Sequence, residues 1–401
     1  MLFVGGLYPI NLYTVLQKYS KYPLQNAPNV FQWALVDGLL SNKVDVDVVS
    51  CPFLPSFPGG YSKIYAPPAE IVLNGNVIGK SLKYNTLAFF KQCSIRNVLF
   101  SYAKDWCEKN KEEKELHVLV YTTWPEYNIP IIKLKEKYPN IVITTIVTDL
   151  IDDALNFDGN KNFLKKLQIS YQKRSIKKTY SKIDKYVLLT KYMVEKIPEA
   201  QDNNIVVEGI AKVSKIDYVK KRNDIKQISY TGGLHDFVGI REFVDAFMKT
   251  DDPSYRLVIC GSGENEKYIK EKCKIDNRIV YKGNVTRDEA VKIQMESLVV
   301  VNPRRPDSLI TRYSFPSKTM EYLSSMTPMI GYHLEGIPEE YYDYMYTPKD
   351  LSKDSMTQLI NEVLNLPLEN LEERAKDARS FIVNNKSSYS QVKRILGFLC
   401  E

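Results

Sequence analysis

The most informative part of the chain is residues 314–323, which read SFPSKTMEYL, together with residues 327–330, which read TPMI. The pattern predicts a loop, then a helix that begins at Pro316, where proline's missing N–H is not needed, and then a short apolar strand. The N–H groups of the first helical turn, with Ser317 and Lys318, are typical of a phosphate site. One turn later, the carboxylate of Glu321 could accept hydrogen bonds from both hydroxyls of a ribose. The stretch therefore indicates a nucleotide-binding site. An ordinary capped helix with a surface lysine would have the same sequence pattern.

The rest of the chain predicts the architecture around this stretch. Short β-branched runs alternate with helical patterns, which is typical of parallel sheets with crossover helices. A chain of 401 residues is too long for one ordinary core. We therefore expect an α/β protein with two Rossmann-like domains, at residues 1–212 and 213–385, facing across a cleft where ligands of open sheets bind. Residues 386–401 are expected to form a helix that packs back on the first domain.

The expected elements follow the same alternation. Strands are predicted at Leu2–Gly5, Val44–Ser50, His117–Tyr121, Ile141–Val147, Lys185–Thr190, Lys226–Tyr230, Tyr255–Cys260, Arg278–Tyr281 and Leu298–Val301. Helices are predicted at Val30–Leu40, Thr86–Glu108, Pro130–Lys137, Asn162–Tyr180, Ile240–Met248, Glu264–Lys274, Arg287–Glu296, Pro316–Ser325, Lys353–Leu364, Leu371–Asn384 and Ser387–Leu399. Residues 54–85, rich in Pro, Gly and Tyr, are expected to leave the sheet.

Composition narrows the class of protein. The chain is 44% hydrophobic and 11% aromatic, which argues against disorder, and it contains no apolar run of the ~20 residues that span a bilayer. The N-terminus has no basic region before its apolar residues and resembles a first strand more than a signal peptide, so we expect a cytoplasmic protein. The six cysteines form no C-x-x-C pair and the three histidines lack zinc spacing. Reduced thiols and no metal are expected.

Positive charge gathers between Lys161 and Lys185, where nine cations accompany one acid, Asp184. Apolar residues interleave with the cations, as in a basic amphipathic helix. One interpretation of this segment is a solvated helix face. The other is a surface that binds anionic lipid or a pyrophosphate-linked acceptor, which would place the protein on the inner face of the plasma membrane. A nucleic-acid partner is not expected, because no zinc-finger or RNP-like pattern accompanies the charge.

Four turns that follow predicted strands of the second domain carry the remaining chemistry. They read YTGGL at 230–234, CGSGE at 260–264, YKGNV at 281–285 and VNPRRP at 301–306. Glycine lets a diphosphate approach the backbone closely, the third turn could read the edge of a base, and arginine suits phosphate. No turn is specific alone, and the G-x-G-x-x-G pattern of a dinucleotide site is absent. From these turns we assign to the donor site Gly232, Gly233, Gly261, Gly263, Val285 and Arg304.

The order and spacing of the four turns, with residues 315–321 after them, resemble the second domain of the large retaining glycosyltransferase family four, which has the GT-B fold. The resemblance covers Lys226–Ile330, and its Phe-Pro-Ser-Lys-x-x-Glu-Tyr-Leu run is most similar to enzymes that build bacterial surface polysaccharides. It implies a nucleotide-sugar donor, a UDP-sugar at the level of the family with a GDP-sugar left open. It also implies a saccharide acceptor, expected to be lipid-linked, and transfer with retention and without a metal.

The resemblance also implies roles for single residues. Glu321 matches the second glutamate of the family's Glu-x7-Glu motif, which holds the ribose. Ser317 and Lys318 match its phosphate-facing turn, and Gly232 matches the glycine that closes over the diphosphate. In the first domain, Gly6 matches the loop that faces the donor phosphates.

Asp149 follows the strand at Ile141–Val147, in the place where relatives often carry an active-site histidine. Its carboxylate could orient the acceptor hydroxyl or accept its proton. It could equally cap the next helix. The candidate catalytic residues are thus Asp149, Lys318 and Glu321.

The chain departs from the family at three positions. Tyr313 replaces the first glutamate of the motif, and Gly233 and Val238 replace the usual phosphate-binding arginine and lysine. The charge that a diphosphate needs must come from other cations, and the candidates are Lys318, Arg304, Arg305 and Arg312. These departures leave open a non-catalytic binding or scaffold subunit on this fold. A nucleotide-sugar epimerase is a third possibility.

Overall fold

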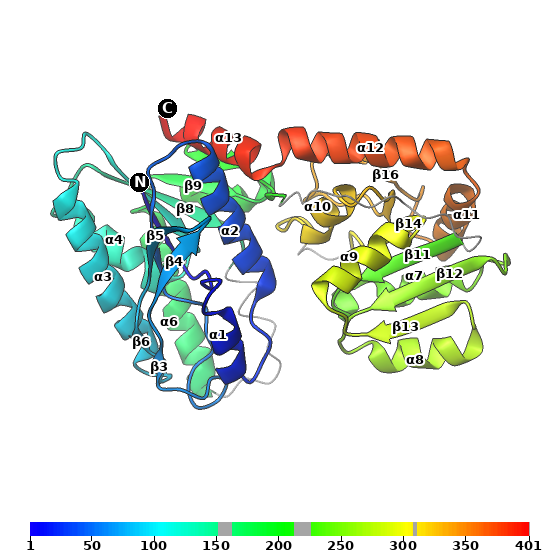
Figure 1. The fold of residues 1–401 in the computed structure, drawn as a ribbon, viewed down its shortest axis with the longest axis horizontal. Coiled ribbons are helices and arrows are strands. Elements are labelled where there is room, and N and C mark those ends of the chain that lie inside the picture. Colours follow the sequence, from blue (N-terminus) through cyan, green and yellow to red (C-terminus); the bar gives the residue numbers. More distant parts are fainter. Residues whose placement is uncertain (151–162, 212–225, 308–310, 401) are drawn as a thin grey trace. The chain divides into compact units, whose positions relative to one another are not determined.

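The computed structural model describes residues 1–150, 163–211, 226–307 and 311–400 (Figure 1). Contacts divide the chain into two compact units. Unit 1 comprises Met1–Ile210 together with Ser388–Glu401, and unit 2 comprises Ala211–Ser387. Each unit is a mixed α/β structure on a largely parallel sheet, which confirms the predicted fold class.

Unit 1 is built on an eight-stranded sheet with the order β10-β9-β8-β7-β1-β2-β5-β4. All neighbouring pairs are parallel except β4 and β5. The strands are β1 Leu2–Gly5, β2 Asp47–Ser50, β4 Ala69–Leu73, β5 Asn76–Ser81, β7 Leu116–Tyr121, β8 Ile141–Val147, β9 Lys185–Leu188 and β10 Asn204–Val206. A separate two-stranded sheet pairs β3 Tyr65–Ala66 with β6 Tyr84–Asn85. All four residues of β1 are buried, as expected for a strand covered on both faces.

Helices cover both faces of this sheet. They are α1 Tyr13–Tyr19, α2 Asn26–Ser41, α3 Lys91–Lys109, α4 Pro125–Lys135, α6 Phe163–Tyr180 and α13 Ser388–Cys400. α2 packs with α13 on one face, and α3 and α6 both pack with α4 on the other (Figure 1). α4 begins at Pro125, five residues before the predicted start, and retains Pro130 inside it. Pro125 fills a position in the first helical turn, where proline's missing N–H costs no hydrogen bond.

The expectation that residues 54–85 leave the sheet is wrong for β4 and β5. These strands form a hairpin whose two-residue turn is Asn74-Gly75, with positive φ at both residues, 51° and 80°. An Asn-Gly pair favours this kind of turn. β5 then joins β2, and Gly79 allows the approach, because a Cβ there would lie 1.8 Å from the carbonyl oxygen of Val48.

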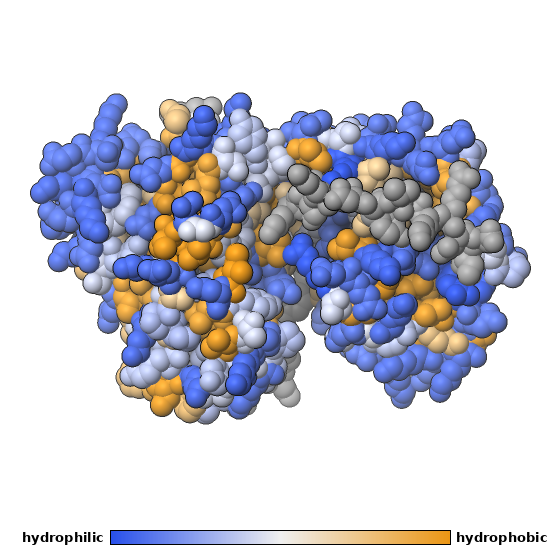
Figure 2. All heavy atoms as spheres, in the orientation of Figure 1, coloured by the Kyte–Doolittle hydropathy of each residue, from blue (hydrophilic) through white to orange (hydrophobic). Residues whose placement is uncertain are grey.

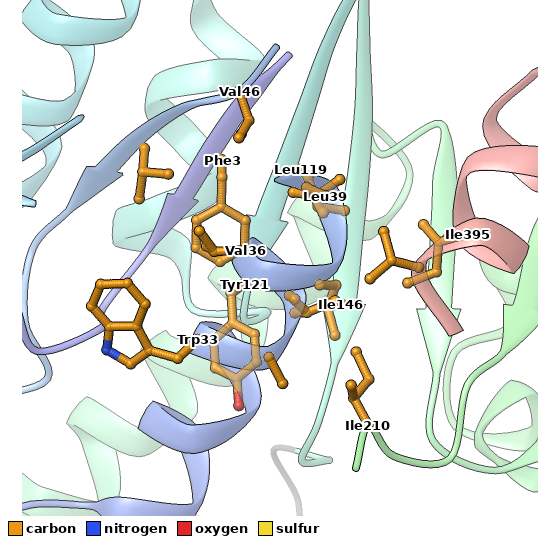
Figure 3. Packing of buried hydrophobic residues seen from close by; sticks show 14 of the residues in the cluster. Phe3, Trp33, Val36, Leu39, Val46, Leu119, Tyr121, Ile146, Ile210 and Ile395 are labelled. Carbon is orange, nitrogen blue, oxygen red and sulfur yellow. The ribbon is translucent and has the colours of Figure 1, made fainter. Parts of the chain in front are cut away.

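The hydrophobic core between the sheet and α2 also takes in α13 (Figure 3). Val392 and Ile395 of α13 are fully buried in one cluster with Phe3 of β1 and Leu39 of α2. Gly38 of α2 permits the contact, since a Cβ at this position would lie 2.4 Å from Ser388 and Val392. The last helix of the chain is therefore part of unit 1.

Unit 2 is built on a six-stranded parallel sheet with the order β13-β12-β11-β14-β15-β16. Its strands are β11 Lys226–Thr231, β12 Tyr255–Cys260, β13 Ile279–Gly283, β14 Val299–Asn302, β15 Met329–Gly331 and β16 Met345–Tyr346. Its helices are α7 Ile240–Phe247, α8 Glu266–Ile275, α9 Arg287–Glu296, α10 Ser317–Leu323, α11 Lys353–Leu364 and α12 Leu368–Asn385. α7 packs with α8 and α11, and α10 packs with α12. The chain reverses direction across the sheet at β11, between β12 and β14.

The basic segment Lys161–Lys185 lies only partly within the described residues. In α6, Ile176 is fully buried, while Arg174, Lys177 and Lys178 are exposed. Lys185 donates to the carbonyl of Phe398 in α13 at 2.7 Å, so its ammonium belongs to the packing of unit 1. Among the described helices, none is both long and apolar enough to cross a bilayer.

Replacing Ile395 by alanine is expected to destabilise unit 1 by about 2–5 kcal/mol, because it opens a cavity between α13, α2 and β1. Chemical denaturation followed by circular dichroism measures the change. Lys393→Ala, on the exposed side of the same helix, is the matched control and is expected to change stability little. Equal effects of the two substitutions would contradict the packing of α13 on unit 1.

Candidate functional site

A pocket of about 260 Å³ lies at the carboxyl edge of the unit 2 sheet. It sits where the strand order reverses, the place where open α/β sheets bind ligands. The turns after β11, β12 and β13 form it together with α9 and α10. Its lining residues are Thr231, Gly232, Gly233, Cys260, Gly261, Ser262, Asn284, Val285, Ala290 and Lys318.

Glycine is required where these turns meet. Gly261 has φ +130°, and a Cβ there would lie 1.8 Å from the carbonyl oxygen of Gly232. The Gly232 N–H donates to Cys260 at 3.0 Å, and the Gly261 N–H donates to Gly283 at 2.8 Å. The turns are therefore locked to one another through their own amides. These two N–H groups support the pocket wall and are already engaged.

The polar end of the site is a network around the carboxylate of Glu321. Lys318 Nζ donates to its two oxygens at 2.9 and 3.0 Å. Gln294 Nε2 donates to the same carboxylate at 2.6 Å and to Thr231 Oγ1 at 2.7 Å. The side chains of Lys318 and Glu321 are 31% and 36% exposed, so a ligand can reach both. Glu321 does not line the pocket itself but is joined to it through Lys318 and Thr231.

The ion pair between Lys318 and Glu321 is weak enough to be exchanged. A pair of this exposure contributes roughly 0.2–1 kcal/mol. A phosphate that approached Lys318 could therefore replace Glu321 as the partner of the Lys318 ammonium at a small cost in free energy. Gln294 of α9 would keep the carboxylate in place, because it donates to Glu321 Oε1 independently of Lys318. The site can bind an anion and a pair of hydroxyls at the same time.

The other cations that the sequence proposed do not line this pocket. Arg304 donates to Ser314 Oγ at 2.9 Å, and burial lowers the pKa of its guanidinium. Arg305 pairs with Asp307 at 2.9 Å, and Arg312 pairs with Glu335. Lys318 is the one charged side chain among the described residues that line the pocket. Of the four cations that the sequence proposes for the anion, Lys318 alone lines this pocket, and its role toward an anion stays a prediction.

The remaining predicted donor residues of unit 2 are near this pocket but outside its wall. Gly263 lies in the second turn, where a Cβ would lie 2.7 Å from the backbone of Leu234. Ser317 is the first residue of α10 and is exposed. Pro316 is the residue before the helix and not its first position, and its carbonyl accepts from the Thr319 N–H at 2.9 Å. One amide of the first turn is thus already bonded.

Unit 1 has its own pocket, of about 450 Å³, at the carboxyl ends of β2, β7 and β8. Aromatic rings form much of its wall: Phe53 lies 6.2 Å from Tyr121 and 5.4 Å from Tyr127 between ring centroids. Asp149 lines the pocket, and its carboxylate accepts from Thr148 Oγ1 at 3.3 Å. Whether Asp149 also caps a helix depends on residues outside the described chain. Apolar walls with a few polar groups are typical of ligand pockets.

Two half-buried charges, Glu126 and Lys91, also line this pocket, and the sequence did not single them out. Glu126 lies in the first turn of α4 and Lys91 is the first residue of α3. Lys91 donates to the carbonyl of Leu54. Burial raises the pKa of Glu126, against the opposing effects of its own N–H and of the Lys91 and Arg96 charges. Burial likewise lowers the pKa of Lys91.

Gly6 is placed by packing within unit 1. A Cβ there would lie 2.2 Å from the ring of Phe53, and its N–H donates to Gln32 Oε1 at 2.8 Å. Trp33 is buried in the core and donates to the carbonyl of Tyr8 at 3.1 Å. The glycine is therefore needed for the close approach of the turn that follows β2, and a role toward donor phosphates stays a prediction.

Sequence reasoning missed Gln294, the residue that orients Glu321. A glutamine inside a helix of the second domain carries no distinctive signal, and only the contact with β11 reveals it. In the part of the chain that the structure describes, no group of three or more His, Cys, Asp or Glu side chains is placed to hold a metal ion.

The raised pKa of Glu126 predicts a pH dependence of stability. The folded state holds this proton more tightly than the unfolded state, so its contribution is fully present below the ordinary pKa and is lost as pH rises through the raised one. Glu126→Gln should therefore gain stability relative to the parent as pH rises above the ordinary pKa of 4.5, measured by chemical denaturation. Glu112→Gln, an exposed carboxylate of the same unit, controls for lost charge. A pH-independent difference between Glu126→Gln and the parent would refute the account.

Residues 225–365 match the family model described as "Glycosyl transferases group 1", which covers most of unit 2. A search of curated proteins gave no match.

Solved structures share the fold of the whole chain at low identity. Sucrose-phosphate synthase from Thermosynechococcus elongatus matches with a TM-score of 0.64 and 11% identity, over 99% of this chain and 98% of its own. HepE from Anabaena, in complex with UDP, matches with a TM-score of 0.62 and 11% identity, over 100% and 99%. The lipopolysaccharide outer core galactosyltransferase WaaB matches with a TM-score of 0.58 and 11% identity, over 99% and 98%. The chain thus has the GT-B fold, and residues 225–365 of unit 2 match a glycosyltransferase family model.

Proposed function

We propose that this protein is a glycosyltransferase that moves a sugar from a UDP-sugar to a saccharide acceptor, with retention. The observation that carries the proposal is the site in unit 2, where Lys318 and Glu321 lie one helical turn apart beside a glycine-walled pocket. The family match over residues 225–365 supports the same class of reaction. HepE was solved with UDP, and TarM from S. aureus was solved with UDP and saccharides, which supports UDP as the nucleotide.

In this proposal each polar group of unit 2 has one task. The base enters the pocket past Val285 and Ala290, the ribose hydroxyls donate to Glu321, and the diphosphate accepts from Lys318. Gln294 is a positioning residue that keeps Glu321 pointed at the ribose. Glycine walls let the nucleotide approach the backbone without a steric barrier.

The reaction breaks the bond between the anomeric carbon and the diphosphate oxygen and forms one from that carbon to the acceptor oxygen. The acceptor's proton passes to the leaving diphosphate or to Asp149. Lys318 stabilises the negative charge that develops on the diphosphate, and preorganised charge of this kind is often the largest catalytic contribution. The step needs no metal to balance.

Unit 1 supplies the acceptor side of the proposal. Its aromatic pocket, with Asp149 and Glu126 on the wall, suits a sugar whose apolar face packs on rings while its hydroxyls reach carboxylates. We propose a lipid-linked acceptor and a role in bacterial surface-polysaccharide synthesis, following the likeness of residues 315–323 to such enzymes.

Replacing Lys318 by alanine should weaken UDP binding about tenfold or more, because one charge-assisted hydrogen bond to phosphate is lost. Thermal-shift titration with UDP, GDP and their sugars measures the affinity, since a ligand of the native state raises the melting temperature. Lys249→Ala is the matched control, because Lys249 pairs with Asp354 at 2.6 Å elsewhere in unit 2.

Unchanged UDP affinity in Lys318→Ala would refute the donor site. Turnover of a UDP-sugar separates the enzyme classes. Consumption that requires an acceptor supports transfer, and conversion of the sugar without an acceptor indicates an epimerase. Binding without any turnover would favour the scaffold alternative that Gly233 and Val238 raise.

A further inference from the structure

Large hydrophobic side chains gather on one exposed surface of unit 1. Of the thirteen exposed large hydrophobics in the described chain, seven lie in three short segments, 10–22, 57–65 and 83–90. They are Ile10, Val15, Tyr22, Ile64, Tyr65, Phe89 and Phe90. Phe89 is 93% exposed and its neighbour Phe90 is 63% exposed. Figure 2 shows apolar side chains interspersed with polar ones over α1 and the β3 end of the unit. We call these three segments the apolar–basic surface.

Hydrogen bonds hold the three segments side by side. The Lys21 N–H donates to Gly60 at 2.9 Å, and the Ser62 N–H donates to Tyr19 at 2.9 Å. The Thr86 N–H donates to Ile64 at 2.7 Å. β3 and β6 pair within the same region. The exposed hydrophobics are therefore neighbours in space and form one surface.

The charged side chains within the three segments are all lysines, and one exposed acid, Glu70, borders them, since its carbonyl accepts from Asn11 Nδ2 at 3.4 Å. Lys18, Lys21, Lys63 and Lys83 are exposed on it, and its segments contain no acid, since residues 1–36, 51–69 and 71–104 lack Asp and Glu. Lys63 lies 4.6 Å from the Tyr19 ring centroid, and Lys83 lies 4.8 Å from that of Tyr65. Cations thus flank the half-buried ring of Tyr19 and the exposed ring of Tyr65, which favours an anionic partner with an apolar interior.

We propose that the apolar–basic surface docks on an anionic lipid bilayer. The lysines would contact acidic headgroups, the tyrosines would lie at the interface, and Phe89, Phe90 and Ile10 would enter the acyl region. A dissolved polyanion explains the lysines but leaves the aliphatic side chains in water. A second copy of the chain would bring like charges together. An anionic bilayer offers acidic headgroups to the lysines and an apolar interior to the hydrophobic side chains.

This docking gives the proposed acceptor a route to unit 1, and to that extent it depends on the proposed function. Tyr22 of the apolar–basic surface also lines the unit 1 pocket. Lys91, another residue of the pocket wall, follows directly after Phe89 and Phe90. A headgroup-linked saccharide in the docked membrane would therefore lie at the mouth of the acceptor pocket. The exposed described part of α6 offers charge without this apolar component.

Flotation with vesicles tests the docking in the absence of donor and acceptor. The full chain should float with phosphatidylcholine vesicles that contain phosphatidylglycerol and should stay behind with phosphatidylcholine alone. Phe89→Ser with Phe90→Ser should lower the bound fraction about tenfold, and so should Lys18→Glu with Lys63→Glu and Lys83→Glu. The matched control for the phenylalanines is Val77→Ser with Ile275→Ser, which replaces two exposed hydrophobic side chains outside the apolar–basic surface. The matched control for the lysines is Lys104→Glu with Lys109→Glu and Lys114→Glu, which reverses three exposed charges outside that surface.

Controls that bind as weakly as the surface variants would overturn the proposal. Binding to dissolved heparin without binding to vesicles would overturn it in favour of a polyanion. UDP thermal shifts on the same preparations report folding of each variant and test the donor site independently. If the parent binds UDP but not vesicles, the docking proposal alone is wrong. If the parent binds vesicles but not UDP, the donor site alone is wrong.

Discussion

The pocket of unit 2, which we propose as the donor site, depends on the close approach of two turns, those after β11 and β12. A Cβ on Gly261 would overlap the carbonyl oxygen of Gly232, at 1.8 Å, so the pocket wall forms only with glycine there. Once the turns meet, their amides bond to neighbouring carbonyls and leave an open, weakly charged hollow at the strand ends. Backbone N–H groups of the pocket wall are thus already hydrogen-bonded within the protein. An anionic ligand must therefore find its positive partner in a side chain.

In the proposed donor site Lys318 supplies that partner, and its surroundings explain why a single cation can suffice. The Lys318 ammonium pairs with the Glu321 carboxylate, and because this ion pair is partly exposed, separating it costs little free energy. When phosphate replaces the carboxylate, Glu321 keeps Gln294 as a donor and becomes an acceptor for hydroxyls. Charge for phosphate and an acceptor for ribose therefore arise from one rearrangement. Gly233 and Val238, which offer no charge, are compatible with binding under this arrangement.

The sequence predicted the strand and helix alternation well because buried parallel strands read as continuous β-branched runs. Ile141–Val147 and Arg287–Glu296 match their predicted bounds, while residues 69–81 were misassigned although Asn74-Gly75 is a hairpin signal. Lys318 could be proposed from its motif. Gln294, Glu126 and Lys91 could not, since their surroundings come from helices and turns distant in sequence. Arg305 and Arg312 have guanidinium groups that suit phosphate, but only the structure reveals that each is paired with a carboxylate.

The central claim is that Glu321 receives the ribose hydroxyls of a nucleotide whose phosphate meets Lys318. Isothermal titration of the parent and of Glu321→Ala with UDP and 2′-deoxy-UDP tests it most directly. We predict that the parent prefers UDP about tenfold or more, and that Glu321→Ala binds both equally, because the acceptor of the missing hydroxyl is gone. If the variant kept the parent's preference for UDP, Glu321 would not contact the ribose and the account of the site would be wrong.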